Sequence, residues 1–188
     1  MKKVSLLFMA LALSITSCKK VTKDTATIET ETVTNEVNTK EITIALTPKS
    51  DSNVSGTVVF TEVNGMVNMT AIMSGLEPGE HAIHIHQSSD CSSTDGKSAG
   101  GHWNPTNQPH GKWGVESGYH KGDIGNFIAD ENGDATISIS TDEWCIGCGD
   151  ETKDIIGKGI IVHAGLDDFT TQPTGDAGGR VSCGGIIE

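Results

Sequence analysis

The sequence predicts an all-β domain folded as a β-sandwich or barrel. Apolar residues occupy every second position in three stretches, residues 41–46, 67–73 and 135–140. A period of two with one apolar face is typical of a half-buried antiparallel strand. Asn64-Gly65 precedes one such stretch, and Asn-Gly is the turn chemistry of tight β-hairpins. Short strands separated by turns favour a sandwich or a barrel.

Residues 54–63, 81–86 and 159–163 are further plausible strands. Two long segments, residues 87–125 and 164–180, interrupt the strand pattern, because they are rich in glycine and have no regular period. Loops of that length in a compact domain usually carry function. We therefore expect two long functional loops.

The N-terminus has the pattern of an export signal. A basic start precedes an apolar run, residues 4–15, which is too short to span a bilayer permanently. The run ends in the sequence ITSC, which resembles a bacterial lipobox whose cysteine, here Cys18, is acylated and begins the mature protein. The alternative is an ordinary signal peptide with an incidental cysteine. Several acyl chains on Cys18 would anchor the protein to a membrane.

These features predict three segments. Residues 1–17 form the lipoprotein signal peptide, and residues 18–40 form a threonine-rich tether that contains no aromatic residue. Such a segment buries too little apolar surface to offset its ordering entropy. Residues 41–188 form one domain of ordinary size.

The charge of the chain excludes one class of partner. The formal net charge is −12 at pH 7, which argues against nucleic acid as a partner. The same charge is unexpected for an enzyme whose substrate is an anion.

Histidines carry the most specific signal in the sequence. His84 and His86 lie two residues apart on a predicted strand, so both imidazoles lie on one face, half of a site for copper or zinc. His163 ends another apolar strand and could join them. Taken alone, His84 and His86 could also be two surface histidines.

A second group lies in the first long loop. His102, His110 and His120 follow one another at intervals of eight and ten residues, and Asp123 comes three residues after His120. Three histidines and one carboxylate make a closed four-ligand set suited to zinc.

The order and spacing of these residues resemble the copper/zinc superoxide dismutase family, which is known for the sandwich architecture. The resemblance runs from about residue 41 to the C-terminus and is carried by several motifs in the same order. They are HAIHIH at 81–86, GHWNP at 101–105, HKGDIGN at 120–126, IVH at 161–163 with Asp167 and Asp168, and GGRVSCG at 178–184.

The resemblance implies a fold and a set of ligands. The fold is an all-β, eight-stranded Greek-key barrel or sandwich with two long functional loops. Copper is held by His84, His86, His102 and His163. Zinc is held by His102, His110, His120 and Asp123, so that His102 bridges both metals as an imidazolate.

The resemblance also implies roles for residues around the metals. Asp167 stands between a copper ligand and a zinc ligand and fixes their tautomers. Arg180 lies by the copper and holds the incoming anion, while His102 delivers a proton. Cys91 and Cys183 form a disulfide. His81 is structural rather than a ligand.

The expected activity is the disproportionation of superoxide to dioxygen and hydrogen peroxide, as extracytoplasmic antioxidant defence. The protein would face the periplasm from a lipid anchor, with the cell surface as an alternative, and a homodimer is possible. A second hypothesis is a metal-binding lipoprotein that stores copper and zinc without turnover. A chaperone-like domain fits poorly because no copper ligand is missing.

Two features have no place in the family pattern. Cys145 and Cys148 form a Cys-x-x-Cys sequence, interpreted as a local disulfide or two free thiols, with an auxiliary soft-metal site as the alternative. The loop of residues 164–179 contains no lysine, so we expect Lys97 to add positive potential near Arg180.

Overall fold

The computed structural model describes residues 38–188. The expected signal peptide, the expected lipid-bearing Cys18 and almost all of the expected tether lie outside these residues. Within residues 38–188, no helix is long and apolar enough to cross a membrane.

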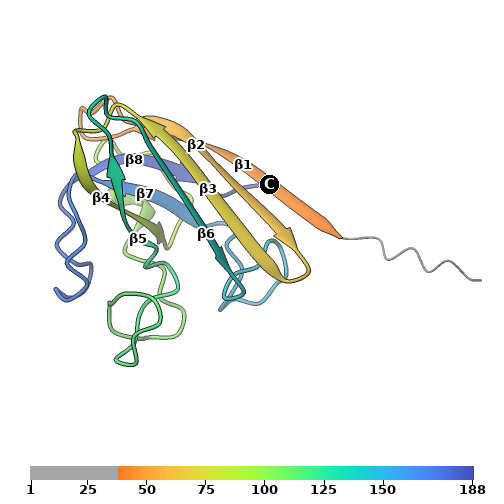
Figure 1. Cartoon of the computed structure of the whole chain (residues 1–188). Helices are drawn as coiled ribbons and strands as arrows, with labels where there is room; N and C mark the ends of the chain where they lie inside the picture. Colours follow the sequence, from red (N-terminus) through yellow and green to blue (C-terminus); the bar gives the residue numbers. More distant parts are fainter. Residues whose placement is uncertain (1–37) are drawn as a thin grey trace, which may run out of the picture. The chain divides into compact units, whose positions relative to one another are not determined.

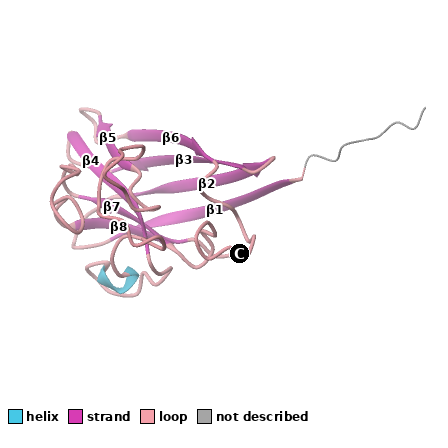
Figure 2. Ribbon diagram, turned by 90° about the horizontal axis from the view of Figure 1, so that it is seen from below, coloured by secondary structure: helices cyan, strands magenta, loops and turns pink. Residues whose placement is uncertain are grey.

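The described chain consists of β-strands joined by turns and loops, with one short 3₁₀ helix, η1 (Figure 2). The elements in chain order are β1 Thr39–Pro48, β2 Ser55–Val63, β3 Met66–Ser74, β4 Gly79–His86, η1 Lys97–Ala99, β5 Gly125–Ala129, β6 Ala135–Thr141, β7 Gly159–His163 and β8 Arg180–Gly185.

The strands form two antiparallel layers that join into a nearly closed barrel (Figure 1). Along the sheet the strand order is β5-β4-β7-β8-β1-β2-β3-β6, and the pairs β4–β7, β1–β8 and β3–β6 are not consecutive in sequence. Only Thr47 and Pro48 of β1 pair with β8, so this short contact joins the two layers. The crossovers and the number of strands confirm the expected eight-stranded Greek-key fold.

The turn between β2 and β3 follows the expected chemistry. Val63 pairs with Met66, so Asn64 and Gly65 form a two-residue hairpin. Both have positive φ, 53° and 80°, which suits the right-handed twist of the flanking strands. Asn and Gly tolerate this conformation better than other residues.

The core lies between the two layers. Phe60 of β2 and Met69 of β3 are fully buried, as is Ile85 of β4. Trp144, from the loop between β6 and β7, closes one end of this core with its ring edge-to-face to Phe60 at 6.2 Å. The rigid barrel therefore fixes the ends of the strands that carry the histidines.

Two strands, β5 and β8, were not among those expected from the sequence pattern, and β1 begins earlier than expected. The expected loop ended at residue 125, and no strand was expected at residues 125–129, because Gly125 and Asn126 weaken the strand signal there. In the structure Phe127 packs inward while Ile128 is 70% exposed, a short alternation on an edge strand. β1 begins at Thr39, slightly before the expected domain start at residue 41.

Candidate metal centre

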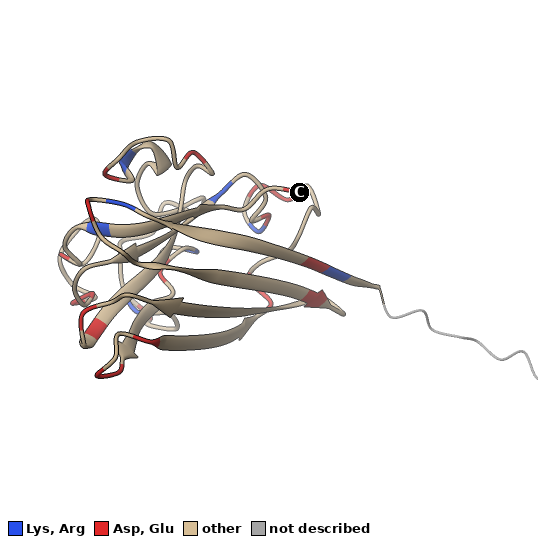
Figure 3. Ribbon diagram, turned by 90° about the horizontal axis from the view of Figure 1, so that it is seen from above, with Lys and Arg blue, Asp and Glu red and all other residues tan. Residues whose placement is uncertain are grey.

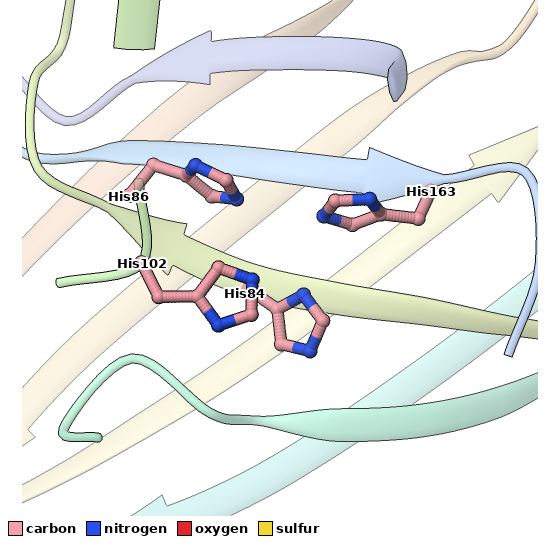
Figure 4. A group of neighbouring side chains, drawn as sticks. All are labelled: His84, His86, His102 and His163. Carbon is pink, nitrogen blue, oxygen red and sulfur yellow. The ribbon is translucent and has the colours of Figure 1, made fainter. Parts of the chain in front are cut away.

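Four histidines converge where β4 and β7 lie side by side, and we call them the copper quartet: His84, His86, His102 and His163 (Figure 4). His84 pairs with Ile161, and His163 lies two residues beyond Ile161, so both imidazoles lie on one face of the sheet. His102 comes from the loop after β4 and forms an isolated β-bridge with His86.

The rings of the copper quartet are close together. The ring centroids of His84 and His102 are 4.0 Å apart, those of His86 and His102 5.0 Å, and those of His84 and His163 4.9 Å. One donor atom from each ring lies within 4.8 Å of those of the other three. All four side chains are buried.

The unpaired ring nitrogens of this quartet fit a metal ion. Nδ1 of His84, Nε2 of His86 and of His102, and both ring nitrogens of His163 have no hydrogen-bond partner although they are buried. Elsewhere on these rings, Nε2 of His84 faces Asp167 and Nδ1 of His86 faces the carbonyl of Gly100 at 2.9 Å. Buried polar atoms without partners are costly, and a soft or borderline metal would satisfy them.

A second group, the zinc quartet, consists of His102, His110, His120 and Asp123. The carboxylate of Asp123 lies 2.8 Å from Nδ1 of His102, 2.9 Å from Nδ1 of His110 and 3.1 Å from Nδ1 of His120. For His110 and His120 these short distances lack the direction of a hydrogen bond, so their Nδ1 atoms count as unpartnered. Three imidazoles and a carboxylate around one point fit a tetrahedral zinc ion.

His102 belongs to both groups. Its Nδ1 faces Asp123 in the zinc quartet, and its Nε2 is the unpartnered atom in the copper quartet. One ring therefore offers one nitrogen to each quartet.

Asp167 lies between a histidine of the copper quartet and a histidine of the zinc quartet. One carboxylate oxygen lies 2.9 Å from Nε2 of His84 and the other lies 2.8 Å from Nε2 of His110. The backbone of Asp167 is held by Asn126, whose side chain accepts from its N–H and donates to its carbonyl, each at 2.8 Å. Asp167 thus orients one imidazole of each quartet.

Burial keeps the imidazoles of the copper quartet neutral. It lowers the pKa of His84, and it lowers the pKa of His86 and His163 well below the ordinary value. It also lowers the pKa of His102 to about 4, although the neighbouring Asp123 acts in the opposite direction. A neutral imidazole has a free lone pair, the form that binds metals.

The carboxylates of the site are strongly acidic. Burial would raise the pKa of Asp123, but the imidazoles of His102, His110 and His120 outweigh burial and hold it far below its usual range. Burial likewise opposes the lowered pKa of Asp167, which His110 and His84 produce. Burial would lower the pKa of His110, yet the two carboxylates raise it to about 9.

Gly122 allows the segment of residues 120–123 to approach β4. A Cβ at Gly122 would lie 2.2 Å from the carbonyl oxygen of Ile85, which no side chain could tolerate. Without one, Ile85 N–H donates to the carbonyl of Gly122, and the N–H of Trp103 donates to the carbonyl of Ile85. These bonds place His102 and residues 120–123 beside the histidines of β4.

Arg180 begins β8 next to the copper quartet. It is the β-ladder partner of His163, across a bulge, and its Nη1 donates to the carbonyl of Gly96 at 2.8 Å. A disulfide between Cys91 and Cys183, with a Cα–Cα distance of 5.8 Å, ties the loop that carries Gly96 to β8. The loop is therefore tied to β8 at two residues, Arg180 and Cys183.

An acidic residue lies beside Lys97, which was expected from the sequence to add positive potential near Arg180. Lys97 lies beside Gly96, but its Nζ is paired with Asp95 at 2.9 Å and its side chain is 78% exposed. Acidic residues occupy loops and strand ends over much of the described surface (Figure 3). Any attraction of an anion by Lys97 is therefore opposed by Asp95.

Sequence reasoning missed several residues that hold the ligands. Gln172 forms two bonds with the backbone of His110, accepting from its N–H and donating to its carbonyl, each at 2.9 Å. Gly100, whose carbonyl lies beside Nδ1 of His86, and Asn126, which holds the backbone of Asp167, were also missed. Only Asn126 carried a signal, because it lies in the motif HKGDIGN at 120–126.

Two expectations concern residues outside the quartets. Both ring nitrogens of His81 lie within hydrogen-bond distance of backbone carbonyls, those of His163 and Glu77, which leaves none for a metal. Cys145 and Cys148 form a disulfide, which corresponds to the simpler of the two interpretations of that pair.

Comparison with known proteins identifies the family. The family model described as copper/zinc superoxide dismutase (SODC) matches residues 54–186. The extracellular superoxide dismutase [Cu-Zn] of Brugia pahangi is 35% identical over 165 residues, which cover 82% of this chain and 80% of that protein. The chain belongs to the copper/zinc superoxide dismutase family.

Solved structures agree with this assignment. A double mutant of a SOD-like protein from Bacillus subtilis has a TM-score of 0.69 and 28% identity, covering 78% of this chain and 97% of that one. The clock protein EA4 has a TM-score of 0.67 and 32% identity, and the match covers 78% of this chain and 94% of that one. This superoxide dismutase is thus a copper- and zinc-dependent enzyme, and its two quartets suit those metals.

Proposed function

We propose that this superoxide dismutase binds copper through His84, His86, His102 and His163, and zinc through His102, His110, His120 and Asp123. The observation that carries the proposal is the set of buried, unpartnered ring nitrogens directed into two adjacent groups. When bound, copper supplies the one-electron oxidation and reduction that convert two superoxide anions to dioxygen and hydrogen peroxide, whereas zinc has no redox chemistry.

His102 is the proton carrier in this proposal. Its Nδ1 faces the zinc quartet and its Nε2 faces the copper quartet, so as an imidazolate it would help to hold both metals. Nε2 is the atom at which a proton would be taken up and released, because peroxide formation consumes two protons per turnover. Asp167 keeps His84 and His110 in fixed tautomers.

Arg180 binds the substrate. It carries a permanent positive charge and a fork of N–H donors, of which Nη1 is held by Gly96. The remaining donors suit a small anion beside His163. A protein that only stores metals has no need of this residue.

We also propose that the enzyme works outside the cytoplasm as antioxidant defence, anchored through a lipid on Cys18 after removal of residues 1–17. The lipobox-like sequence supports this, as does the extracellular description of the Brugia pahangi relative. Metabolic labelling with a fatty acid tests it: label should enter the wild-type chain and be absent from Cys18→Ser.

The catalytic roles are tested by pulse radiolysis of the full chain loaded with copper and zinc. We expect Arg180→Ala to lower the second-order rate constant at least tenfold and Arg180→Lys to recover part of it, because Lys keeps the charge but loses the fork. Metal content per chain, measured in parallel, should not change. Equal rates for the wild type and Arg180→Ala would contradict the substrate-binding role of Arg180, whereas negligible turnover by the metal-loaded wild type would favour metal storage.

A further inference from the structure

A two-residue segment of the loop between β6 and β7 holds both neighbours of His120. Nε1 of Trp144 donates to the backbone carbonyl of Lys121 at 2.9 Å. The carboxylate of Glu143 accepts from the hydroxyl of Tyr119 at 2.5 Å and binds Nζ of Lys121. Glu143 and Trp144, which are distant in sequence, therefore bind the residues on both sides of His120.

This segment is itself anchored in the barrel. Trp144 is 1% exposed and its ring packs against Phe60 and, at 5.1 Å, against Trp113. Trp113 donates from Nε1 to the carbonyl of His120 at 3.0 Å. The N–H of Glu143 donates to Oγ1 of Thr141, at the end of β6. These contacts thus fix the position of residues 119–121 relative to the core.

His120 needs such support more than the other imidazoles of the zinc quartet. His110 is oriented through its second ring nitrogen by Asp167, and His102 has its second nitrogen in the copper quartet. Within residues 38–188, Nε2 of His120 makes no hydrogen bond, and its loop has no regular secondary structure. Its placement therefore depends on its backbone.

We propose that Glu143 and Trp144 are positioning residues for the zinc site, which hold His120 in place for the metal through Tyr119 and Lys121. The proposal rests on the assignment of His120 as a zinc ligand under the proposed function. Packing alone does not account for the segment, because a phenylalanine at 144 would fill much of the same core space but could not donate to Lys121.

The test is the zinc dissociation constant of the full chain, stripped of metal and titrated with Zn²⁺ in competition with a chromogenic chelator. We expect Trp144→Phe and Glu143→Gln each to weaken zinc binding about tenfold, as groups that orient metal ligands do. Asp142→Asn is the matched control, because it makes the same charge change next to Glu143 and no hydrogen bond to the Asp142 side chain occurs within residues 38–188. It should change the constant less than twofold.

A second readout separates positioning from general stability. The absorption spectrum of the Co²⁺-substituted protein reports ligand geometry, and it should change in Trp144→Phe and Glu143→Gln but not in Asp142→Asn. Dissociation constants within twofold of the wild type for both variants, with unchanged Co²⁺ spectra, would overturn the proposal. If Trp144→Phe does not fold, Glu143→Gln decides.

The ligand assignment is checked separately with His120→Ala. Weaker zinc binding in that variant, together with unaffected Glu143→Gln and Trp144→Phe, contradicts only the positioning role. Zinc binding that is unaffected by His120→Ala contradicts the proposed zinc site itself.

Discussion

Nε2 of His84 lies 2.9 Å from a carboxylate oxygen of Asp167, and both side chains are completely buried. The other oxygen of the same carboxylate lies 2.8 Å from His110. A single acidic residue therefore connects a histidine of the copper quartet to one of the zinc quartet, and it occupies only one nitrogen of each ring.

Removal of this charge should weaken both metal sites. We expect Asp167→Asn to weaken the binding of copper and zinc by about ten- to a hundredfold, because the amide cannot accept from both imidazoles. Isothermal titration of each metal measures the effect. Asp176→Asn is the control, since Asp176 is an exposed acid of the same loop. A change confined to one metal would contradict the linking role.

The disulfide between Cys91 and Cys183 should contribute far more to stability than the one between Cys145 and Cys148. The sequence separations are 92 and 3 residues. Loop-closure entropy in the unfolded chain then predicts about 4 to 5 kcal/mol for the first and about 2 kcal/mol for the second. Denaturant unfolding of the metal-free double serine variants measures both free energies. Equal losses would show that chain entropy does not govern their contributions.

Zinc binding should release a proton near neutral pH. The pKa of His110 in the metal-free protein is raised to about 9, so its ring is protonated at pH 7 and must lose that proton to bind zinc. Zinc affinity should therefore rise with pH up to about 9 and level off above it. Copper binding to His84, His86 and His163 should release almost none, because burial lowers their pKa values.

Calorimetry in buffers of different ionisation enthalpy counts these protons. About one proton per zinc from the wild type, and fewer from His110→Ala, is the expected result. A proton count near zero for zinc at pH 7 would contradict the raised pKa of His110.

The acidic residue beside Lys97 should slow the capture of an anion. We expect Asp95→Asn to raise the dismutation rate at low ionic strength by about twofold, because it leaves the positive charges of Lys97 and Arg180 unopposed. Lys97→Ala should lower the rate by less, since its charge is already paired. Glu131→Gln, on the exposed turn between β5 and β6, is the control. If Asp95→Asn keeps the wild-type rate at low salt, steering by this loop is excluded.

The sequence predicted the barrel well because its strands alternate clearly. β1, β3 and β6 were found from period two, and Asn64 with Gly65 located a hairpin. β5 was missed because its five residues are too few, and its Gly and Asn too weak, to show a period. The histidines of both quartets came from motif order, since local spacing alone left their roles open.

The supports of the site were harder to predict because they come from distant segments. Asn126 of β5 meets Asp167, and Trp144 meets Lys121, only after the barrel has brought distant segments of the chain together. No local pattern encodes such contacts. The disulfide Cys91–Cys183 could be anticipated only through the family resemblance, because the four cysteines other than Cys18 allow three full pairings.

The central claim, that superoxide turns over at a copper ion held by the copper quartet, is tested most directly by the dismutation rate per bound copper. His86→Ala, which removes a ligand of copper alone, is compared with His81→Gln, a substitution at a buried histidine outside both quartets. We expect fast turnover by the wild type, a similar rate per copper for His81→Gln, and a loss of at least a hundredfold for His86→Ala. Tight binding of one copper and one zinc without dismutation by the wild type, or full activity in His86→Ala, would contradict the account.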